Sequence, residues 1–174
     1  MADSVGLRDY EDLLSDSGGY RDIEIDMLGE AIESFRANPD KPYTVLEIRD
    51  GKTLASLVIA ARIPSREYTF EIRCLCVDRD YISTKAGKHI LGMIDEDFLR
   101  KNPKALIQYE TSTKKLKSVG RELVESAGFN LIGHIPDFYS PGDDFFMYSK
   151  FLSRVSTAPE SVPENIKEKP GHAT

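Results

Sequence analysis

A strand that runs into a helix through a short polar loop lies near the middle of the chain. Apolar residues alternate along the strand and predict one buried face: Tyr68, Phe70, Ile72, Cys74 and Cys76. The run becomes fully apolar from Cys74 to Val77 and ends at the charged residues Asp78-Arg79-Asp80. We therefore expect the core to be built around this strand.

The helix that follows begins almost at once. Its apolar residues recur at helical spacing: Ala86, Ile90, Met93 and Ile94. Ser83 or Thr84 stands where an N-cap residue is preferred. Unpaired backbone N–H groups and the positive end of the helix dipole converge at such a helix start, and Lys85 and Lys88 add positive charge. The junction is a candidate phosphate or pyrophosphate site; the alternative is a solvated lysine pair that binds nothing.

Length and charge limit the classes of protein. The 174 residues, 40% of them hydrophobic, suffice for one domain with a core. A net charge of −6 argues against a general affinity for nucleic acid or for an anionic membrane. No apolar run approaches the ~20 residues of a membrane helix, and the acidic N-terminal sequence lacks the features of a signal peptide. We expect a cytoplasmic protein with no nucleic-acid or membrane partner.

The two cysteines, Cys74 and Cys76, are predicted to be free. On a strand their side chains point to the same face, and they are too close in sequence for an ordinary disulfide. The three histidines, His89, His134 and His172, show no metal-ligand spacing. No metal is therefore expected.

The remaining chain predicts alternating helices and strands. Helices are expected over 7–14, 23–37 and 119–127, and the central helix should run to about Lys101. Strands are expected over 43–49, 53–63, 105–110, 131–136 and 145–151. Asp50-Gly51 should join the first two strands in a tight turn in which both residues take positive φ. This order implies a mixed sheet covered on both faces.

Beyond Leu152 the composition changes. Residues 153–174 contain three prolines and almost no large apolar side chains, which predicts a disordered C-terminal tail. The folded domain is therefore expected to span residues 1–152.

Two further stretches, besides the central strand and helix, resemble a known family. Tyr109-Glu110-Thr111-Ser112, followed by Arg121 and Ala127-Gly128-Phe129, looks like a core strand and helix of the GNAT-type N-acetyltransferase superfamily. The segment 135–144, with Met147, Tyr148 and Lys150 after it, is similar to the closing hairpin of a bacterial and archaeal subgroup. The resemblance covers residues 7–152. It implies an α/β fold with a mixed, mostly antiparallel sheet, a V-shaped splay between two central strands, and helices on both faces.

The resemblance also implies acetyl-CoA as co-substrate, bound where those two strands part. Backbone groups of Leu75, Cys76 and Val77 would pair with the pantetheine arm like an added strand, and one N–H would polarise the thioester carbonyl. The aligned phosphate loop precedes Lys88 and reads Ile82, Ser83, Thr84, Lys85, Ala86 and Gly87. In the family, this loop has Gln or Arg at its first position, Gly at its fourth and Gly or Ala at its sixth. In this chain only the sixth position matches. Backbone N–H groups could still hold pyrophosphate, with Lys85 replacing the arginine, whereas a Cβ can obstruct the approach that glycine permits.

Acetyl transfer to an amine needs a base, a donor at the carbonyl oxygen and usually an acid for the thiolate. The resemblance makes Glu110 the first candidate base and Glu71 the second, acting through water; a solvated edge carboxylate is the alternative for each. The family's acid, a tyrosine, is replaced by Val124, which donates no proton. Tyr139 is the candidate substitute, unless Phe138-Tyr139 is a packing pair.

The sequence thus favours an acetyl-CoA-dependent N-acetyltransferase acting on a primary amine of a small molecule or protein. The alternative is a GNAT-fold protein that binds acyl-CoA or a protein partner without turnover, because positions 82, 85 and 124 depart from the family pattern. A phosphate-binding module of another α/β kind has only the loop to support it. In such folds the acceptor is selected by the N-terminal helices and by loops near Pro64 and Ser140. The apolar final strands could also pair in a homodimer.

Overall fold

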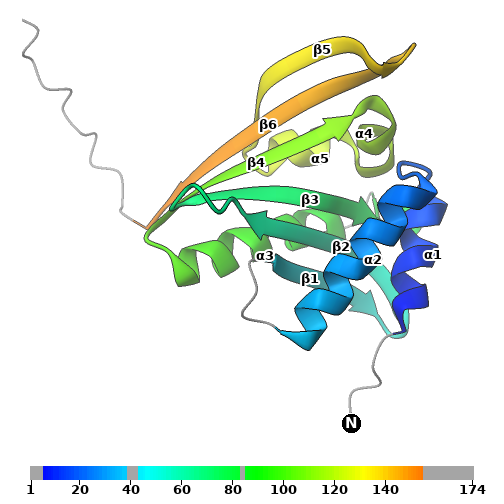
Figure 1. Ribbon diagram of the computed structural model, residues 1–174, viewed down its shortest axis with the longest axis horizontal. Helices are drawn as coiled ribbons and strands as arrows, with labels where there is room; N and C mark the ends of the chain where they lie inside the picture. Colours follow the sequence, from blue (N-terminus) through cyan, green and yellow to red (C-terminus); the bar gives the residue numbers. More distant parts are fainter. Residues whose placement is uncertain (1–5, 39–42, 83–84, 155–174) are drawn as a thin grey trace, which may run out of the picture.

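The computed structural model describes residues 6–38, 43–82 and 85–154, which form one six-stranded sheet with helices on both faces (Figure 1). The strands are β1 (Tyr43–Asp50), β2 (Thr53–Arg62), β3 (Thr69–Val77), β4 (Lys104–Ser112), β5 (Asn130–Ser140) and β6 (Asp143–Ser153). Their order across the sheet is β1-β2-β3-β4-β6-β5. Neighbouring strands are antiparallel except for the parallel pair β3 and β4. The predicted mixed, mostly antiparallel sheet is confirmed.

Helices divide the core into two parts. They are α1 (Leu7–Ser17), α2 (Asp22–Ala37), the 3-10 turn η1 (Arg79–Tyr81), α3 (Lys85–Lys101), α4 (Thr113–Val119) and α5 (Arg121–Ser126). Apolar residues of α1 and α2 pack on one face of β2 and β3, whereas α3, α4 and α5 pack on the other. None of the helices in the described part of the chain is long and apolar enough to cross a membrane. Apart from residues 153 and 154, the predicted tail lies outside the described residues.

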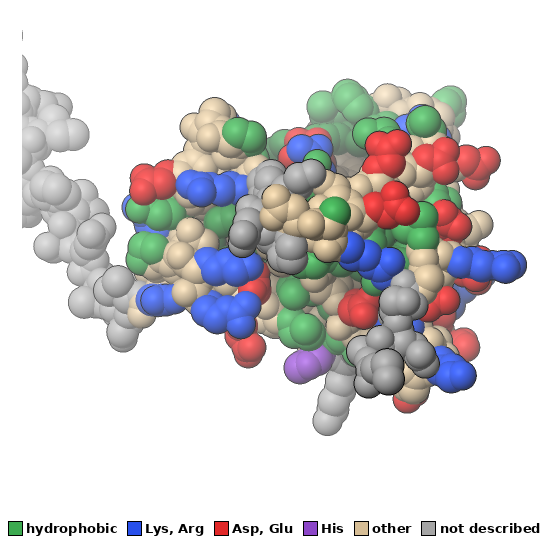
Figure 2. Space-filling model, turned by 60° about the horizontal axis from the view of Figure 1, so that its bottom comes forward, with side chains coloured by type: hydrophobic (Ala, Val, Ile, Leu, Met, Phe, Trp, Pro, Cys, Tyr) green, Lys and Arg blue, Asp and Glu red, His purple; other side chains and the backbone are tan. Residues whose placement is uncertain are grey.

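Charge is unevenly spread over the surface. On the face shown in Figure 2, basic side chains gather toward the left and acidic side chains toward the right, with apolar side chains between them. The acidic sequence of α1, LRDYEDLLSDS, contributes to the excess of negative charge in the whole chain. Such an uneven distribution attracts charged ligands to one side of a protein more than to the other.

A bulge in β3 changes the predicted face of the strand. Residues 59 and 60 of β2 are adjacent, yet they pair with Cys74 and Ile72. Arg73 therefore has no paired residue on β2. The inserted residue reverses the alternation of side chains. Phe70 and Ile72 therefore pack with α3, whereas both cysteines pack with α1 and α2. The prediction of a single face from Tyr68 to Cys76 is wrong after Ile72, although both thiols are buried and free as predicted.

The predicted hairpin of β1 and β2 has a different turn. Asp50 pairs with Thr53, so the loop contains only Gly51 and Lys52. Gly51 has a φ of 59°, and Asp50 does not take a positive φ. The expectation that Asp50 and Gly51 both take positive φ is therefore wrong at Asp50, because this residue still belongs to the ladder.

Gly120 divides the predicted helix 119–127. Its φ of 91° and ψ of 120° cannot continue a helix, so α4 ends before it and α5 begins after it. A residue with a Cβ rarely adopts this conformation. The apolar periodicity alone gave no sign of the break, since it continues through both helices.

Replacing Gly120 by alanine is expected to lower the free energy of unfolding by about 1–3 kcal/mol, because alanine is strained at this φ. Denaturation in urea measures the change. Gly92→Ala in α3 is the matched control: a Cβ there meets no atom within 4 Å, and alanine favours a helix over glycine by up to about 1 kcal/mol. Equal effects of the two substitutions would contradict the strain at Gly120.

Candidate active site

β3 and β4 are paired over only part of their length. Their parallel register runs from Thr69↔Leu106 to Ile72↔Tyr109. After that point β3 continues to Val77 along β2, and β4 continues to Ser112 along β6. The two strands therefore part as predicted, and the main-chain groups on their facing edges have no partner strand in the described part of the chain (Figure 1).

Two of the three predicted backbone positions face this gap. The Asp78 N–H donates to the Ala55 carbonyl of β2. Because successive residues of a strand direct their N–H and C=O groups to opposite edges, Cys76 also faces β2, and Leu75 and Val77 face the gap. Cys76 therefore directs its main chain to β2, and Leu75 and Val77 direct theirs to the gap.

The hydroxyl of Tyr20 is hydrogen-bonded to both main-chain groups of Leu75. The Leu75 N–H donates to this hydroxyl at 3.3 Å, and the hydroxyl donates to the Leu75 carbonyl at 3.0 Å. Tyr20 lies in the turn between α1 and α2 and is buried, and the Nζ atom of Lys115 lies 4.8 Å from its ring centroid. A ligand that uses the backbone of Leu75 must displace this hydroxyl. Tyr20 was not predicted as a site residue, because a single aromatic residue after the Gly18-Gly19 turn follows no periodic pattern.

A cavity of about 360 Å³ lies beside the start of α3. It is lined by Ile82 and Lys88, and by residues of α4, α5 and the junction between them: Val119, Gly120, Glu122, Leu123 and Ser126. Two of the predicted phosphate-loop residues thus meet at one cavity. Ser83 and Thr84 lie outside the described residues, as do the side chains of Lys85 and Ala86.

Gly87 allows α3 to approach α5 closely. A Cβ on Gly87 would lie 2.7 Å from the Cδ2 atom of Leu123. Gly87 is buried, so its lack of a side chain serves the contact between the two helices at the wall of the cavity. This packing role is independent of any contact between its N–H and a phosphate.

The two candidate bases lie in different parts of the sheet. Glu110 lies one residue beyond the last pair of β3 and β4 and is exposed. Its neighbours Tyr109 and Thr111 are buried on the α3 side of the sheet, so Glu110 points to the opposite side. Glu71 lies where the strands are still paired, and its carboxylate forms an ion pair with Arg73 at 2.9 Å. Of the two candidate bases, Glu110 therefore lies where β3 and β4 part.

Tyr139 lines a second cavity of about 210 Å³, between the turn after α1 and the β5–β6 hairpin. Its lining is highly charged: Arg21, Glu24, Lys114, Lys115 and Asp143. Burial raises the pKa of Tyr139 most, and the carboxylates of Glu110, Glu24 and Asp143 raise it further. Its ring also packs edge-on against Phe138, with centroids 4.9 Å apart. Tyr139 thus brings a protonated hydroxyl to the side of the sheet that Glu110 faces.

An ion pair between Glu24 and Lys115 connects α2 to α4 at this cavity, with 2.7 Å between Oε1 and Nζ. Burial raises the pKa of Glu24, but hydrogen bonds from Lys115 and Arg21 together lower it further, so the net shift is downward. The native carboxylate binds a proton less tightly than the unfolded one. Its contribution to stability is therefore present above the unfolded pKa and is lost as the pH falls through the folded pKa.

Glu24→Gln is expected to lower the free energy of unfolding at pH 7 by less than about 1 kcal/mol, and by less still at pH 3. Urea denaturation at both pH values measures this difference. Glu33→Gln, at an exposed position of the same helix, is the control and should change stability little at either pH. A loss that is the same at pH 3 as at pH 7 would exclude the ion pair as its cause.

Comparisons with known proteins bear on the fold. No protein-family model matches the sequence, and no curated protein matches it. A candidate acetyltransferase of the GNAT family from Desulfovibrio desulfuricans has a TM-score of 0.73 and 19% identity, over 88% of this chain and 95% of its own. An aminoglycoside 6′-N-acetyltransferase complexed with coenzyme A has a TM-score of 0.63 and 14% identity, over 86% and 93%.

A third similar structure is a candidate acetyltransferase from Salmonella typhimurium with its cofactor acetyl-CoA. Its TM-score is 0.63 at 13% identity, over 89% of this chain and 91% of its own. The likeness to all three extends over nearly the whole described chain. At such low identities it shows a shared fold. Among the described residues, no three or more His, Cys, Asp or Glu side chains form a group that could hold a metal ion.

Proposed function

We propose that this chain, which has the fold of the GNAT-type N-acetyltransferases, transfers an acetyl group from acetyl-CoA to a primary amine of a small molecule or protein. The observation that carries this proposal is the parting of β3 and β4 after Ile72 and Tyr109. It leaves strand-edge hydrogen-bonding groups between β3 and β4, and a cavity lies at the start of α3. The structures with bound coenzyme A or acetyl-CoA support the choice of thioester.

The thioester would bind on the α3 side of the gap. Its phosphates would lie near Ile82 and Lys88, which line the cavity at the start of α3. Its pantetheine arm would pair with the main chain of Val77, which faces the gap, in the manner of an added strand. When Tyr20 releases Leu75, the Leu75 N–H can polarise the thioester carbonyl.

The amine would approach from the side that Glu110 faces. Glu24 and Asp143 are paired there with Lys115 and Lys114, so Glu110 is the carboxylate that would attract a protonated amine. Glu110 then takes the proton, directly or through water, so that the amine nitrogen can attack the acyl carbon. The C–N bond forms, the C–S bond breaks, and the sulfur leaves with the electron pair.

Thermal denaturation with acetyl-CoA tests the binding step. At a hundredfold excess over Kd, acetyl-CoA should raise the free energy of unfolding by about 2.7 kcal/mol, which raises the melting temperature by several degrees. The matched ligand control is 3′-phospho-ADP, which has the phosphates and lacks the pantetheine arm, and it should give a smaller shift. Thiol release with a panel of amines then reports transfer. No shift at millimolar acetyl-CoA would reject the proposal.

A second candidate is a GNAT-fold protein that binds acyl-CoA or a protein partner without turnover. It is favoured by the hydrogen bonds of Tyr20 to Leu75, and by Val124, which is fully buried where the family has a tyrosine. A shift of the melting temperature with acetyl-CoA, without thiol release for any amine, would support this candidate over the enzyme.

A further inference from the structure

Two buried hydroxyls of β4 stand where the strands part. Tyr109 is 2% exposed and Thr111 is 1% exposed, and neither hydroxyl has a hydrogen-bond partner among the described residues. Tyr109 is the last residue of β4 that pairs with β3, and Thr111 lies beyond it on the same face. Buried polar groups without a partner destabilise the native state, and such groups call for an explanation. A ligand in the gap would satisfy them.

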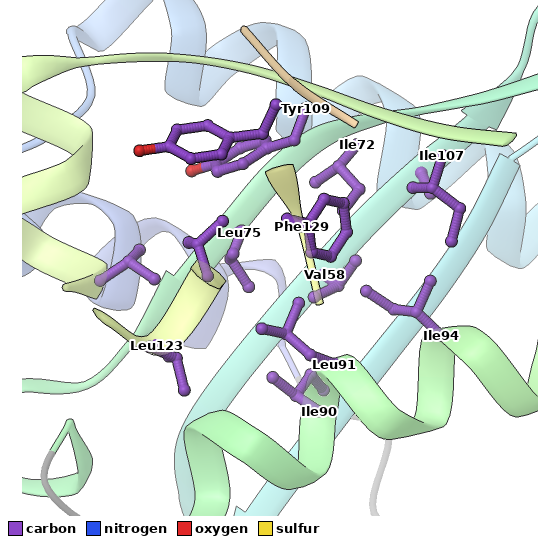
Figure 3. Packing of buried hydrophobic residues seen from close by; sticks show 14 of the residues in the cluster. Val58, Ile72, Leu75, Ile90, Leu91, Ile94, Ile107, Tyr109, Leu123 and Phe129 are labelled. Atoms are coloured by element: carbon purple, nitrogen blue, oxygen red, sulfur yellow. The ribbon is translucent and has the colours of Figure 1, made fainter. Parts of the chain in front are cut away.

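The surroundings of Tyr109 place its hydroxyl at the gap. Figure 3 shows its ring near Leu75, on the side of the sheet that α3 covers. Burial raises the pKa of Tyr109 most, and Thr111 lowers it. The thiols of Cys74 and Cys76 and the hydroxyl of Tyr148 raise it further. Both thiols belong to the half of β3 that has left β4. The net upward shift keeps this hydroxyl protonated at neutral pH, so it is a donor.

Other donors at this place are occupied or absent. Tyr20 holds the main chain of Leu75 through two hydrogen bonds. Val124 is fully buried at the position where the GNAT-type enzymes have a tyrosine that gives a proton to the thiolate. The cavity beside α3 is lined by Val119 and Leu123, which belong to the same apolar cluster as Tyr109. The cavity and Tyr109 thus border the same apolar cluster.

We propose that the Tyr109 hydroxyl, with Thr111 beside it, donates a hydrogen bond to the sulfur of the bound thioester as this sulfur becomes a thiolate. The inference rests on the proposed acetyl transfer. The amine nitrogen bonds to the acyl carbon, the C–S bond breaks, its electron pair goes to sulfur, and Glu110 accepts the amine proton. Tyr109 keeps its own proton and stabilises the developing negative charge.

Tyr148 provides a matched control. It lies directly opposite Tyr109 on β6, its exposed fraction is 0%, and its hydroxyl also lacks a partner among the described residues. Burial raises the pKa of Tyr148, and the side chains that affect it next are Arg121 and Glu125 of α5. Its hydroxyl lies near α5, and it also raises the pKa of Tyr109, whereas the thiols of β3 act on Tyr109 and not on Tyr148.

The test compares Tyr109→Phe with Tyr148→Phe in the full chain. Both substitutions keep the ring and remove an unpaired hydroxyl, so neither should lower the melting temperature. Only Tyr109→Phe should lower kcat, by about 10- to 100-fold, while the KM for acetyl-CoA changes less than about threefold. Thr111→Val should lower kcat in the same direction and by a smaller factor.

The outcomes separate this inference from the function on which it rests. Unchanged kcat in Tyr109→Phe, or an equal loss in Tyr148→Phe, would overturn the inference and leave acetyl transfer intact. No rise in the wild-type melting temperature with acetyl-CoA would overturn both. If the wild type binds acetyl-CoA without turnover, the Kd of coenzyme A decides: about a tenfold increase in Tyr109→Phe alone supports the contact with sulfur, and no increase rejects it.

Discussion

Replacing Glu110 by glutamine is expected to lower the turnover number by about a hundredfold or more, and to leave the Kd of acetyl-CoA within about twofold. Glutamine keeps the size and the acceptor oxygen of the side chain but cannot take a proton at neutral pH. Glu110 is exposed at the opening between β3 and β4, so the substitution should not affect folding. Steady-state kinetics with a reactive amine and calorimetric titration with acetyl-CoA measure the two quantities.

Glu71→Gln is the matched control for this experiment. Glu71 lies in the paired part of the strands and forms an ion pair with Arg73, so its loss should change turnover by less than about fivefold. A large loss in Glu71→Gln with little loss in Glu110→Gln would reverse the assignment of the base. Little change in either variant would remove both carboxylates from the chemistry.

Truncating Phe98 to alanine is expected to lower the free energy of unfolding by about 3–5 kcal/mol, enough to unfold a marginally stable domain. Phe98 is 1% exposed in the core between α3 and the sheet, and its ring stacks on Phe70 with centroids 4.1 Å apart. Alanine would leave a cavity at the closed end of the β3–β4 pair. Urea denaturation followed by circular dichroism measures the loss.

Phe151→Ala is the same change on the surface. Phe151 is 65% exposed on β6, so its truncation should alter the free energy of unfolding by less than about 0.5 kcal/mol. Comparable losses in the two variants would mean that Phe151 is covered in solution, for example by a second copy of the chain. A small loss in Phe98→Ala would contradict the packing of α3 on β3.

The elements that the sequence predicted well are those with a strong periodic signal. The stripe of Ile25, Leu28 and Ile32 predicted α2 within one residue of its start, because these side chains share one buried face. The parting of β3 and β4 was expected from the resemblance to a family. Periodicity alone does not carry this information, since it reports which face of a strand is buried and not where two strands stop pairing.

The features that were missed depend on single residues or on distant contacts. One inserted residue, Arg73, sends Cys74 to the other face, and the apolar pattern on either side of it gives no warning. Gly120 stops a helix whose apolar spacing continues past it. The bond from Tyr20 to Leu75 joins residues 55 positions apart. The bulge and the bond of Tyr20 depend on tertiary pairing that a local window of sequence does not contain, whereas the break at Gly120 depends on the backbone conformation of a single residue.

The two hydrogen bonds of Tyr20 occupy the main-chain groups of Leu75 that the proposed thioester would use, so Tyr20 and the thioester would compete for them. If the thioester carbonyl binds at Leu75 as proposed, only molecules in which Tyr20 has moved away could accept it, and the measured Kd would exceed the intrinsic Kd by the inverse of their fraction. Substitutions in the turn between α1 and α2 would therefore tune cofactor affinity without touching any atom that contacts the nucleotide.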